Sequence, residues 1–293
     1  MRPAPLRAGD LVAVVAPSSP FEHVIVWKGL SFLRERYRLR FDRGLFTRTH
    51  YLAGSDARRR DELARALEDP DVKAIIAARG GYGAGRFVHE MPWEALRQRP
   101  RWIVGFSDIT ALHVEAQRVG VMSLHASHVT ALGWCDRTAR AKIVAALEEP
   151  FAPRRFDALE TWAPGDAEGT LFGGNLAILH ACAAAGRLHV PDGSIIFIED
   201  VTERPYRLDR MLAGLLVGGH FKSARGFVVG ELTDCTPGPD GATAHRVLRE
   251  LLEPLGVPVV AGFPSGHGRR NEPLVLGGRA RIRAAATGVV ELG

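Results

Sequence analysis

The sequence predicts an α/β protein in which a parallel sheet with helices on both faces is followed by a smaller α/β domain. Short runs of apolar, mostly β-branched residues alternate with segments whose apolar residues recur at helical spacing. This alternation stops at residues 149–168, where three prolines occur among charged residues without periodicity, and then starts again. A chain of 293 residues is long enough for one large or two medium domains with buried cores. We therefore predict a first domain over residues 1–148, a linker over 149–168 and a second domain over 169–293.

The first half is expected to alternate between strands and helices. The run Leu11–Ala16 is apolar on both faces, which is typical of a central parallel strand. Ser55 is a good N-cap for a helix that ends before Pro70. The other expected elements are helices at 21–35, 109–119 and 138–148, and strands at 37–41, 72–77, 102–106 and 121–124. In sheets of this kind ligands bind at the carboxyl ends of the strands, so the residues that follow each strand are the first candidates for function.

The second half is expected to form the smaller domain. It restarts at residues 169–175 with an apolar helix to Ala185, and Pro205 opens another helix at a position that proline favours. Residues 274–292 have the turn residues and the alternation of β-hairpins. The other expected elements are strands at 194–198, 226–230 and 257–261, and a helix at 243–252.

The charge pattern argues against a nucleic-acid partner. The net charge is +5 and the isoelectric point is about 9.4. The basic residues are nearly all arginines scattered among acids, and the longest basic run, Arg58–Arg60, falls on a predicted helix face. A nucleic-acid-binding protein would show a basic stripe interleaved with aromatic residues. Some of these arginines are instead suited to holding the carboxylates of a small anionic substrate.

The sequence predicts a cytoplasmic protein that does not bind membranes. The beginning of the chain lacks the pattern of a signal peptide, and no apolar stretch approaches the length of a membrane span. The three cysteines are widely spaced and form no C-x-x-C motif. A disulfide framework or a structural zinc site is therefore not expected.

The stretch from Arg101 to Thr110 is the central candidate for function. An apolar strand runs through Gly105 and Ser107 directly into a helical pattern. A serine at such a junction lies on a sharp turn, and the free N–H groups of the following helix point at whatever is bound there. The nucleophile elbow has the pattern G-x-S-x-G, but Ile109 stands where the last glycine would be. A plain N-cap serine also fits this stretch, so a base, an acid and oxyanion donors must be found elsewhere.

Glu199 and His267 are the candidates for the acid and the base. A serine hydroxyl needs a base to take its proton, and the base needs an acid to fix its tautomer. Glu199 ends an apolar strand, where a carboxylate is either partly buried and paired or a cap on the strand. His267 has a glycine on each side, which a structural histidine seldom needs. The order Ser107, Glu199, His267 is that of the α/β-hydrolases.

The turn Gly80-Gly81-Tyr82-Gly83 follows the predicted third strand. It lacks the lysine and hydroxyl residue of a P-loop, and it does not complete G-x-G-x-x-G. It is either a turn that needs positive φ or a set of N–H groups that faces a developing oxyanion. In the second case the N–H of Asp108 would be the other donor.

His125 and His128 form an H-x-x-H pair, but the H-E-x-x-H pattern of zinc peptidases is absent. We expect these histidines to have packing or hydrogen-bonding roles, and we predict no metal and no cofactor. Two alternatives stay open. One is a metallohydrolase that uses both histidines with Glu199, and the other is a non-catalytic protein that binds a sugar or nucleotide at the glycine turn.

Taken together, these motifs resemble the LD-carboxypeptidase family of serine peptidases, and the resemblance extends over nearly the whole chain. The matching motifs are Gly9-Asp10 with Val15–Ser19, Arg79–Gly83, Gly105–Asp108, Gly173–Leu176, Glu199–Val201 with Tyr206–Arg210, and Gly262–His267. The resemblance implies a Rossmann-like first domain and a smaller α/β domain in a cytoplasmic homodimer. It also implies cleavage of the bond between an L-centre and a terminal D-alanine in tetrapeptides recycled from murein.

The resemblance also implies roles for individual residues. Ser107 is the nucleophile, His267 the base and Glu199 its orienting acid. The oxyanion hole comes from the turn at Gly80 and Gly81 and from the N–H of Asp108. Among motif residues we assign Arg79, Tyr82 and Asn175 to substrate binding, with Arg79 or Arg86 as the partner of a substrate carboxylate.

One departure from the family pattern bears on the substrate. The family has His-Gly-Pro after the strand that follows the nucleophile helix, but this chain has His125-Ala126-Ser127. A related branch of the family cleaves acyl-sulfamoyl or aminoacyl-nucleotide toxins of the microcin C type, which is the alternative substrate. The short connection between Glu199 and His267 leaves little room for an extra substrate loop and favours murein peptides.

Overall fold

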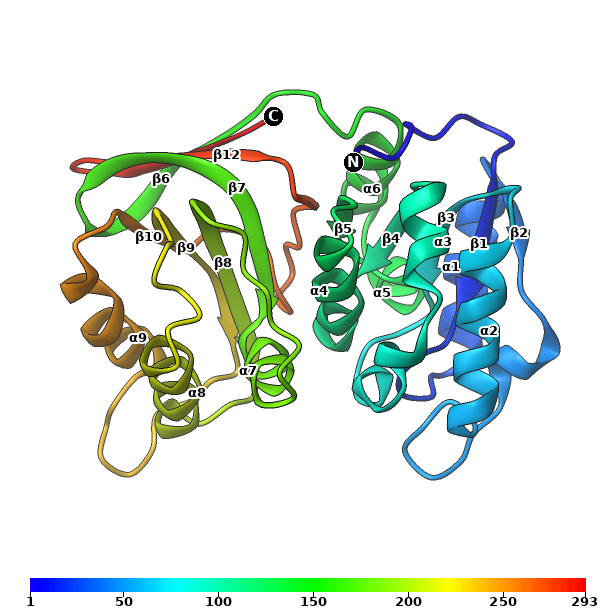
Figure 1. Cartoon of the computed structure of the whole chain (residues 1–293), viewed down its shortest axis with the longest axis horizontal. Helices are drawn as coiled ribbons and strands as arrows, with labels where there is room; N and C mark the ends of the chain where they lie inside the picture. The colour runs from blue at the N-terminus through cyan, green and yellow to red at the C-terminus, as the bar shows by residue number, and fades with distance from the viewer. The chain divides into compact units, whose positions relative to one another are not determined.

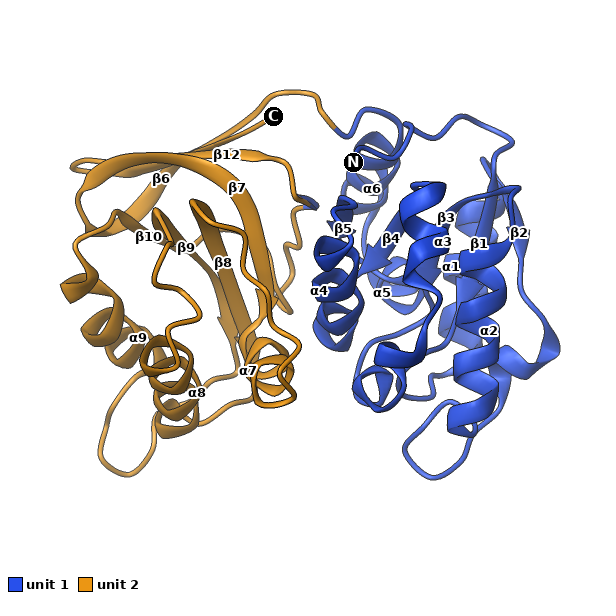
Figure 2. Ribbon diagram, in the orientation of Figure 1, with its two compact units in different colours: residues 1–150, 273–275 blue, residues 151–272, 276–293 orange.

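The computed structural model describes all 293 residues and places them in two compact units (Figures 1 and 2). Unit 1 contains Met1–Pro150 and Pro273–Val275, and unit 2 contains Phe151–Glu272 and Leu276–Gly293. None of the helices has the length and apolar character that a membrane crossing requires. The predicted α/β class is confirmed, because strands and helices alternate along most of the chain.

Unit 1 is built on a six-stranded sheet in the order β11-β5-β4-β3-β1-β2. Its five N-terminal strands pair in parallel, and β1 is buried along its whole length, which explains its unbroken apolar sequence. The strands are β1 (Leu11–Val15), β2 (Arg38–Arg40), β3 (Val72–Ala77), β4 (Trp102–Gly105), β5 (Ser123–His125) and β11 (Leu274–Leu276). The carboxyl ends of β1, β3 and β4 therefore lie at the same edge of this sheet.

Helices pack beside this sheet in two groups, α1 with α5 and α2 with α3. The α-helices are α1 (His23–Arg34), α2 (Asp56–Glu68), α3 (Trp93–Gln98), α4 (Thr110–Arg118), α5 (Val129–Trp134) and α6 (Arg137–Glu148). Short 3₁₀ helices are η1 (Arg43–Phe46), η2 (Ala84–Arg86), η3 (Val88–Glu90) and η4 (Ser107–Ile109). Ser55 caps α2 as predicted, because its side chain accepts a hydrogen bond from the N–H of Arg58.

In unit 2 the strands close on themselves in the order β10-β6-β13-β12-β7-β8-β9. The run β7, β8, β9 and β10 is parallel, and β6, β12 and β13 pair antiparallel. The strands are β6 (Arg154–Ala163), β7 (Gly165–Asn175), β8 (Ser194–Val201), β9 (Gly226–Thr233), β10 (Val259–Ala261), β12 (Arg279–Ala284) and β13 (Gly288–Leu292). The helices are α7 (Leu176–Ala184), α8 (Pro205–Val217), α9 (Ala244–Leu252) and the 3₁₀ helix η5 (Glu253–Leu255).

Two expectations about chain segments are wrong. The linker expected at residues 149–168 is instead occupied by β6 and the first part of β7. Much of β6 is exposed, so its sequence is rich in charged residues and lacks an apolar run. Residues 274–276, expected in a hairpin, form β11 in the sheet of unit 1, whereas the hairpin of β12 and β13 is present.

Candidate active site

Ser107 lies in a strained turn between β4 and α4. Its φ is 66°, in the left-handed region that non-glycine residues rarely adopt, and its side chain is half-buried. Gly105 has a φ of 157°, and a Cβ there would lie 2.8 Å from Cγ1 of Ile109. Ile109 thus packs directly over the glycine that precedes the turn. The elbow geometry is therefore present although the last glycine of the sequence motif is not.

The glycine turn after β3 lies against Ser107. A Cβ at Gly80 would lie 2.8 Å from Cβ of Ser107 and 3.1 Å from its Oγ. Gly81 has a φ of 103°, and a Cβ there would lie 2.4 Å from Oγ of Ser19. The N–H of Ser19 donates to the carbonyl of Gly80 at 3.2 Å, and its Oγ accepts from the N–H of Tyr82 at 3.1 Å. Positive φ and close approach both require glycine here, so the two readings of this turn are compatible.

Of the backbone positions expected to bind an oxyanion, Gly80, Gly81 and Asp108, the last two have N–H groups that are available. Neither the N–H of Gly81 nor that of Asp108 donates a hydrogen bond within the protein. Gly81 is in the turn that contacts Ser107, and Asp108 follows Ser107 directly. Free N–H groups next to a nucleophile are what stabilisation of a tetrahedral intermediate needs.

The carboxylate of Asp108 connects three segments of unit 1 behind the serine. It accepts hydrogen bonds from Oγ of Ser18 at 2.6 Å and from the N–H of Ala84 at 2.9 Å. Burial raises the pKa of Asp108, and these two hydrogen bonds oppose that shift. Asp108 therefore holds the serine turn to the loop after β1 and to η2. Ser18 was not predicted as a site residue, although it lies in the Val15–Ser19 motif.

Arg59 supports the same loops from α2. Its guanidinium is fully buried and donates to the carbonyls of Pro17 and, at 2.8 Å, of Gly83. The placement of Arg58–Arg60 on a helix face is correct for the helix, but at Arg59 that face points inward. A single buried arginine within a basic run has no distinguishing signal in the sequence.

In unit 2, His267 and Glu199 form a hydrogen-bonded pair. Nδ1 of His267 lies 2.7 Å from Oε2 of Glu199, and the carboxylate is fully buried. Glu199 is near the end of β8, and His267 is in the loop that follows β10. Of the two readings of Glu199, the buried and paired one is therefore confirmed.

The glycines beside His267 lie close to neighbouring carboxylates. Gly266 has a φ of 145°, and a Cβ there would lie 3.2 Å from Oε2 of Glu199. A Cβ at Gly268 would lie 1.7 Å from Oε2 of Glu231, a residue of β9. Gly266 therefore adopts a backbone conformation that favours glycine, and Gly268 leaves room for the carboxylate of Glu231 where that side chain now lies.

Three carboxylates set the electrostatics around His267. Burial lowers its pKa, but the hydrogen bond and charge of Glu199, with the charges of Asp200 and Glu231, outweigh burial, so the net pKa is raised. Burial and the nearby charge of Glu199 raise the pKa of Asp200 to about 6. Burial also raises the pKa of Glu231. Glu231 was not predicted, although it follows the apolar run 226–230 much as Glu199 follows the run 195–198.

Asn175 holds the acidic end of β8 in place. Its Oδ1 accepts from the N–H of Ile178 and caps α7, and its Nδ2 donates to Asp200 at 3.1 Å. Asp200 also accepts from the N–H groups of Ala177 and Val201. The side chain of Asn175 is buried and has a positioning role, and contact with a substrate stays a prediction.

The predicted substrate-binding residues of unit 1 are exposed. Arg79 donates to the carbonyl of Pro20, and no carboxylate pairs with it. Arg86, the other candidate for a substrate carboxylate, pairs with Asp56 at 2.8 Å. Tyr82 is 53% exposed, and the centroid of its ring lies 5.9 Å from that of Tyr51. Of the two arginines, Arg79 is the one available to a ligand.

His128 has a structural contact in unit 1. Its Nδ1 accepts from the N–H of Ala131 and caps α5, and its ring stacks on Phe106 at 4.7 Å. His125 is buried in the same region. No three side chains of histidine, cysteine, aspartate or glutamate gather in a way that could hold a metal ion.

The predicted site residues thus form two groups, one in each unit. Ser107, the glycine turn and Asp108 are together in unit 1, and Glu199, His267 and Asn175 are in unit 2. Within each group the structure gives the contacts described above.

Comparisons with known proteins match both parts of the chain. The family model described as the LD-carboxypeptidase N-terminal domain matches residues 12–126, and the model of the C-terminal domain matches 168–282. A probable murein peptide carboxypeptidase of Bacillus subtilis is 32% identical over 100% of this chain and 95% of its own length. The murein tetrapeptide carboxypeptidase of Pseudomonas aeruginosa is 33% identical over 89% of each chain.

Solved structures show the same fold. A muramoyltetrapeptide carboxypeptidase from Oxalobacter formigenes has a TM-score of 0.86 and 28% identity, and the match covers 97% of this chain and 98% of that one. MccF in complex with glutamyl sulfamoyl guanosine has a TM-score of 0.88 over 99% of this chain and 98% of that one. Its identity is only 19%, so this second likeness is one of fold alone.

Proposed function

This chain belongs to the LD-carboxypeptidase family and is a serine-type carboxypeptidase, and from that premise we propose that it releases the terminal D-alanine of murein tetrapeptides. The observation that supports this most directly is the hydrogen-bonded pair of His267 and Glu199, which is the acid–base half of a serine peptidase. The strained turn at Ser107 supports the other half.

In the proposed reaction, Oγ of Ser107 attacks the carbonyl carbon of the bond to D-alanine. His267 takes the hydroxyl proton on Nε2, and its Nδ1–H donates to the ionised Glu199, which stabilises the imidazolium. The imidazolium then gives its proton to the departing amine of D-alanine, leaving an acyl-enzyme on Ser107. Water, deprotonated by the same imidazole, attacks the acyl group and regenerates the serine.

The negative oxygen that forms in both steps is proposed to be stabilised by the N–H groups of the Gly80–Gly81 turn and of Asp108. The contact of this turn with Ser107 and the free N–H groups support that assignment. One such donor contributes about 3 kcal/mol to the transition state in comparable sites. Because Asp108 is tied to Ser18 and Ala84, its N–H and the glycine turn would keep their geometry during the reaction.

We favour murein peptides over aminoacyl-nucleotide toxins as substrates. The relatives with more than 30% identity include proteins named for murein peptides, whereas MccF resembles the chain in fold at 19% identity. We further infer a cytoplasmic homodimer, which rests on the family resemblance alone. Light scattering of the purified protein and fractionation of cells would test these two points.

A single assay tests the proposed function. The purified enzyme and its Ser107→Ala variant are incubated with murein tetrapeptide, each with and without EDTA, and free D-alanine is measured. We expect release by the wild-type enzyme in both conditions and none by the variant. Release that survives Ser107→Ala would contradict the serine mechanism, and loss of release in EDTA would favour the metallohydrolase. Cleavage of an aminoacyl sulfamoyl nucleotide but not of the tetrapeptide would favour the alternative substrate.

A further inference from the structure

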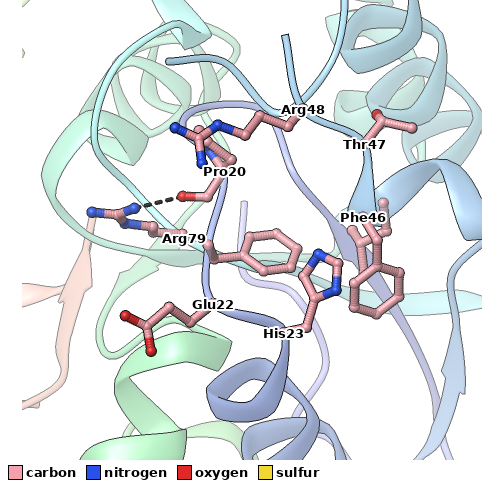
Figure 3. A pocket seen from close by; sticks show the side chains of 9 residues that line it. Pro20, Glu22, His23, Phe46, Thr47, Arg48 and Arg79 are labelled. Carbon is pink, nitrogen blue, oxygen red and sulfur yellow. Dashed lines mark hydrogen bonds between the residues drawn. The ribbon is translucent and has the colours of Figure 1, made fainter. Parts of the chain in front are cut away.

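Next to the glycine turn, unit 1 contains a pocket of about 260 Å³ (Figure 3). Its walls come from the segment that leads into α1, from the end of η1 with the residues after it, and from Arg79. Phe21, His23 and Phe46 form an aromatic wall, with ring centroids 5.8 Å apart for Phe21 and Phe46 and 5.1 Å apart for His23 and Phe46. Figure 3 shows Arg48 and Arg79 near Pro20, on the other side from the rings of His23 and Phe46.

The two arginines carry positive charge that the protein leaves without a carboxylate partner. Nε of Arg48 donates to the carbonyl of His50 at 3.0 Å, and Arg79 donates to the carbonyl of Pro20. Neither forms an ion pair, whereas Arg58 and Arg86 in the same unit do. An arginine that is bound only through carbonyls keeps its charge and most of its donors available.

One carboxylate, that of Glu22, also lines the pocket. Because Arg48 and Arg79 also line the pocket, its net charge is positive. Glu22 is also the N-cap position of α1 but makes no side-chain cap, so the first N–H groups of that helix add partial positive charge on the same side. The pocket therefore combines an apolar aromatic wall with an excess of positive charge.

The pocket is directly connected to the glycine turn. Arg79 precedes Gly80, where a Cβ would touch Ser107, and Pro20 follows Ser19, which is hydrogen-bonded to the turn. Because neighbouring Cα atoms are about 3.8 Å apart, the pocket begins within about one residue of the turn. A carbonyl at Ser107 and a group in this pocket can thus belong to one short peptide.

We propose that this pocket binds a carboxylate of the substrate, held by Arg48 and Arg79, with the apolar carbons next to that carboxylate packed on Phe21 and Phe46. The inference rests on the proposed peptidase function and extends it to the recognition of the peptide. A guanidinium group can bind both oxygens of a carboxylate in one plane. A lysine or a neutral side chain of the peptide would therefore not be favoured in this pocket. The carboxylate has two possible sources, the C-terminal residue or a side chain on the acyl side of the scissile bond.

Arg48 provides the cleaner test, because its one hydrogen bond is to His50 in its own loop and it is not next to the glycine turn. In the Ser107→Ala background, calorimetry would measure the binding of murein tetrapeptide with Arg48 intact, with Arg48→Ala and with Arg48→Lys. We expect Arg48→Ala to weaken binding about tenfold, the loss of one charge-assisted contact at an exposed site, and Arg48→Lys to recover part of it. The matched control is Arg97→Ala, an exposed arginine of α3 paired with Glu94.

Peptides with single amidated carboxylates identify the group in the pocket. Amidation of the carboxylate that Arg48 holds should weaken binding to the protein with Arg48 intact. The amidated peptide should then bind this protein and the Arg48→Ala variant with equal affinity. If that peptide has a C-terminal amide, the leaving residue occupies the pocket, and if it has an amidated side chain, the acyl side does. In the active enzyme, Arg48→Ala should raise KM about tenfold and leave kcat unchanged, which a general loss of structure would not do.

The inference and the proposed function can fail separately. The carboxylate pocket is overturned if the unmodified peptide binds equally well with and without Arg48. It is also overturned if the affinity difference between these two proteins persists with every amidated peptide. Either result would hold even if the wild-type enzyme releases D-alanine. Binding that depends on Arg48 without any release of D-alanine overturns the proposed reaction and leaves the pocket assignment in place. Unchanged thermal unfolding of the Arg48 variants confirms that the measured losses concern recognition.

Discussion

Nδ1 of His267 and Oε2 of Glu199 lie 2.7 Å apart entirely within unit 2. The carboxylate is fully buried and the imidazole keeps partial exposure, so the proposed acid is shielded from solvent and part of the proposed base is not. One contact that orients the imidazole of His267 therefore comes from a carboxylate of its own unit.

Replacing Glu199 with glutamine should keep the shape of this pair and remove its charge. The amide can still contact Nδ1, but it no longer stabilises the imidazolium, and it can favour the wrong tautomer of His267. We expect kcat for D-alanine release to fall by about 10⁴, as in other triads that lose this charge. Steady-state kinetics measure the effect, with circular dichroism as the control for folding. A loss of less than tenfold would mean that Glu199 is not the orienting acid.

Two substitutions at Ser107 distinguish its proposed catalytic role from the backbone strain of its turn. Ser107→Ala and Ser107→Gly should both reduce the rate by about four to six orders of magnitude. Because φ at this position is 66°, glycine should make the protein more stable than alanine by about 1 kcal/mol. Urea unfolding of the two variants gives that difference. Equal stabilities would show that the turn relaxes when the hydroxyl is removed.

The glycine turn can be tested with two glycines of the segment after β3, Gly80 in the turn and Gly85 in η2. Gly80→Ala should push a methyl group into Ser107 and displace the oxyanion donors, with a loss of about 100-fold in kcat. Gly85→Ala is the matched control, because a Cβ there meets nothing within 4 Å and its φ is not in the left-handed range. If both variants keep the wild-type kcat, the turn has no part in the chemistry.

Glu231 should contribute to the pH dependence of activity. The base must be neutral to accept a proton, so kcat/KM rises with pH through the pKa of His267 in the free enzyme. Since the charge of Glu231 helps to raise that pKa, Glu231→Gln should move the acidic limb of the profile to lower pH. Glu250→Gln, an exposed change on α9, should leave the limb where it is. If the acidic limb does not move in Glu231→Gln, the charge of Glu231 does not raise the pKa of His267.

Asp200 should make the folded protein less stable as the pH rises from 4 to 6. The pKa of Asp200 is about 6 in the folded protein, whereas its ordinary value is 3.8. The folded state therefore favours the protonated carboxyl group over the ionised one. That contribution is complete below the unfolded pKa and is lost as the pH rises through the folded pKa, by up to about 3 kcal/mol. Asp200→Asn should remove this part of the pH dependence, which urea unfolding at several pH values measures. Parallel curves for the two proteins would contradict the shifted pKa.

The sequence predicts the two halves of the candidate site better than it predicts the segments that support them. Ser107 and Glu199 both follow apolar strands, and His267 has a glycine on each side, so local pattern is enough to single them out. Glu231 follows an apolar run in the same way, but only the fold brings it beside Gly268. Arg59 differs from Arg58 and Arg60 only in the direction of its side chain, which depends on how α2 packs. The half-exposed strand β6 has no apolar run, so its sequence resembles that of a linker.

The path of the chain restricts how the molecule can be divided. The backbone leaves unit 1 after Pro150, returns for Pro273–Val275 and leaves again at Leu276. The returning segment supplies β11, the edge strand beside β5. A truncated chain that ends at residue 150 would lack this strand and expose the hydrogen-bonding groups of β5 to self-association. A chimera that takes the amino-terminal half from a relative therefore also needs that relative's short stretch near residue 274.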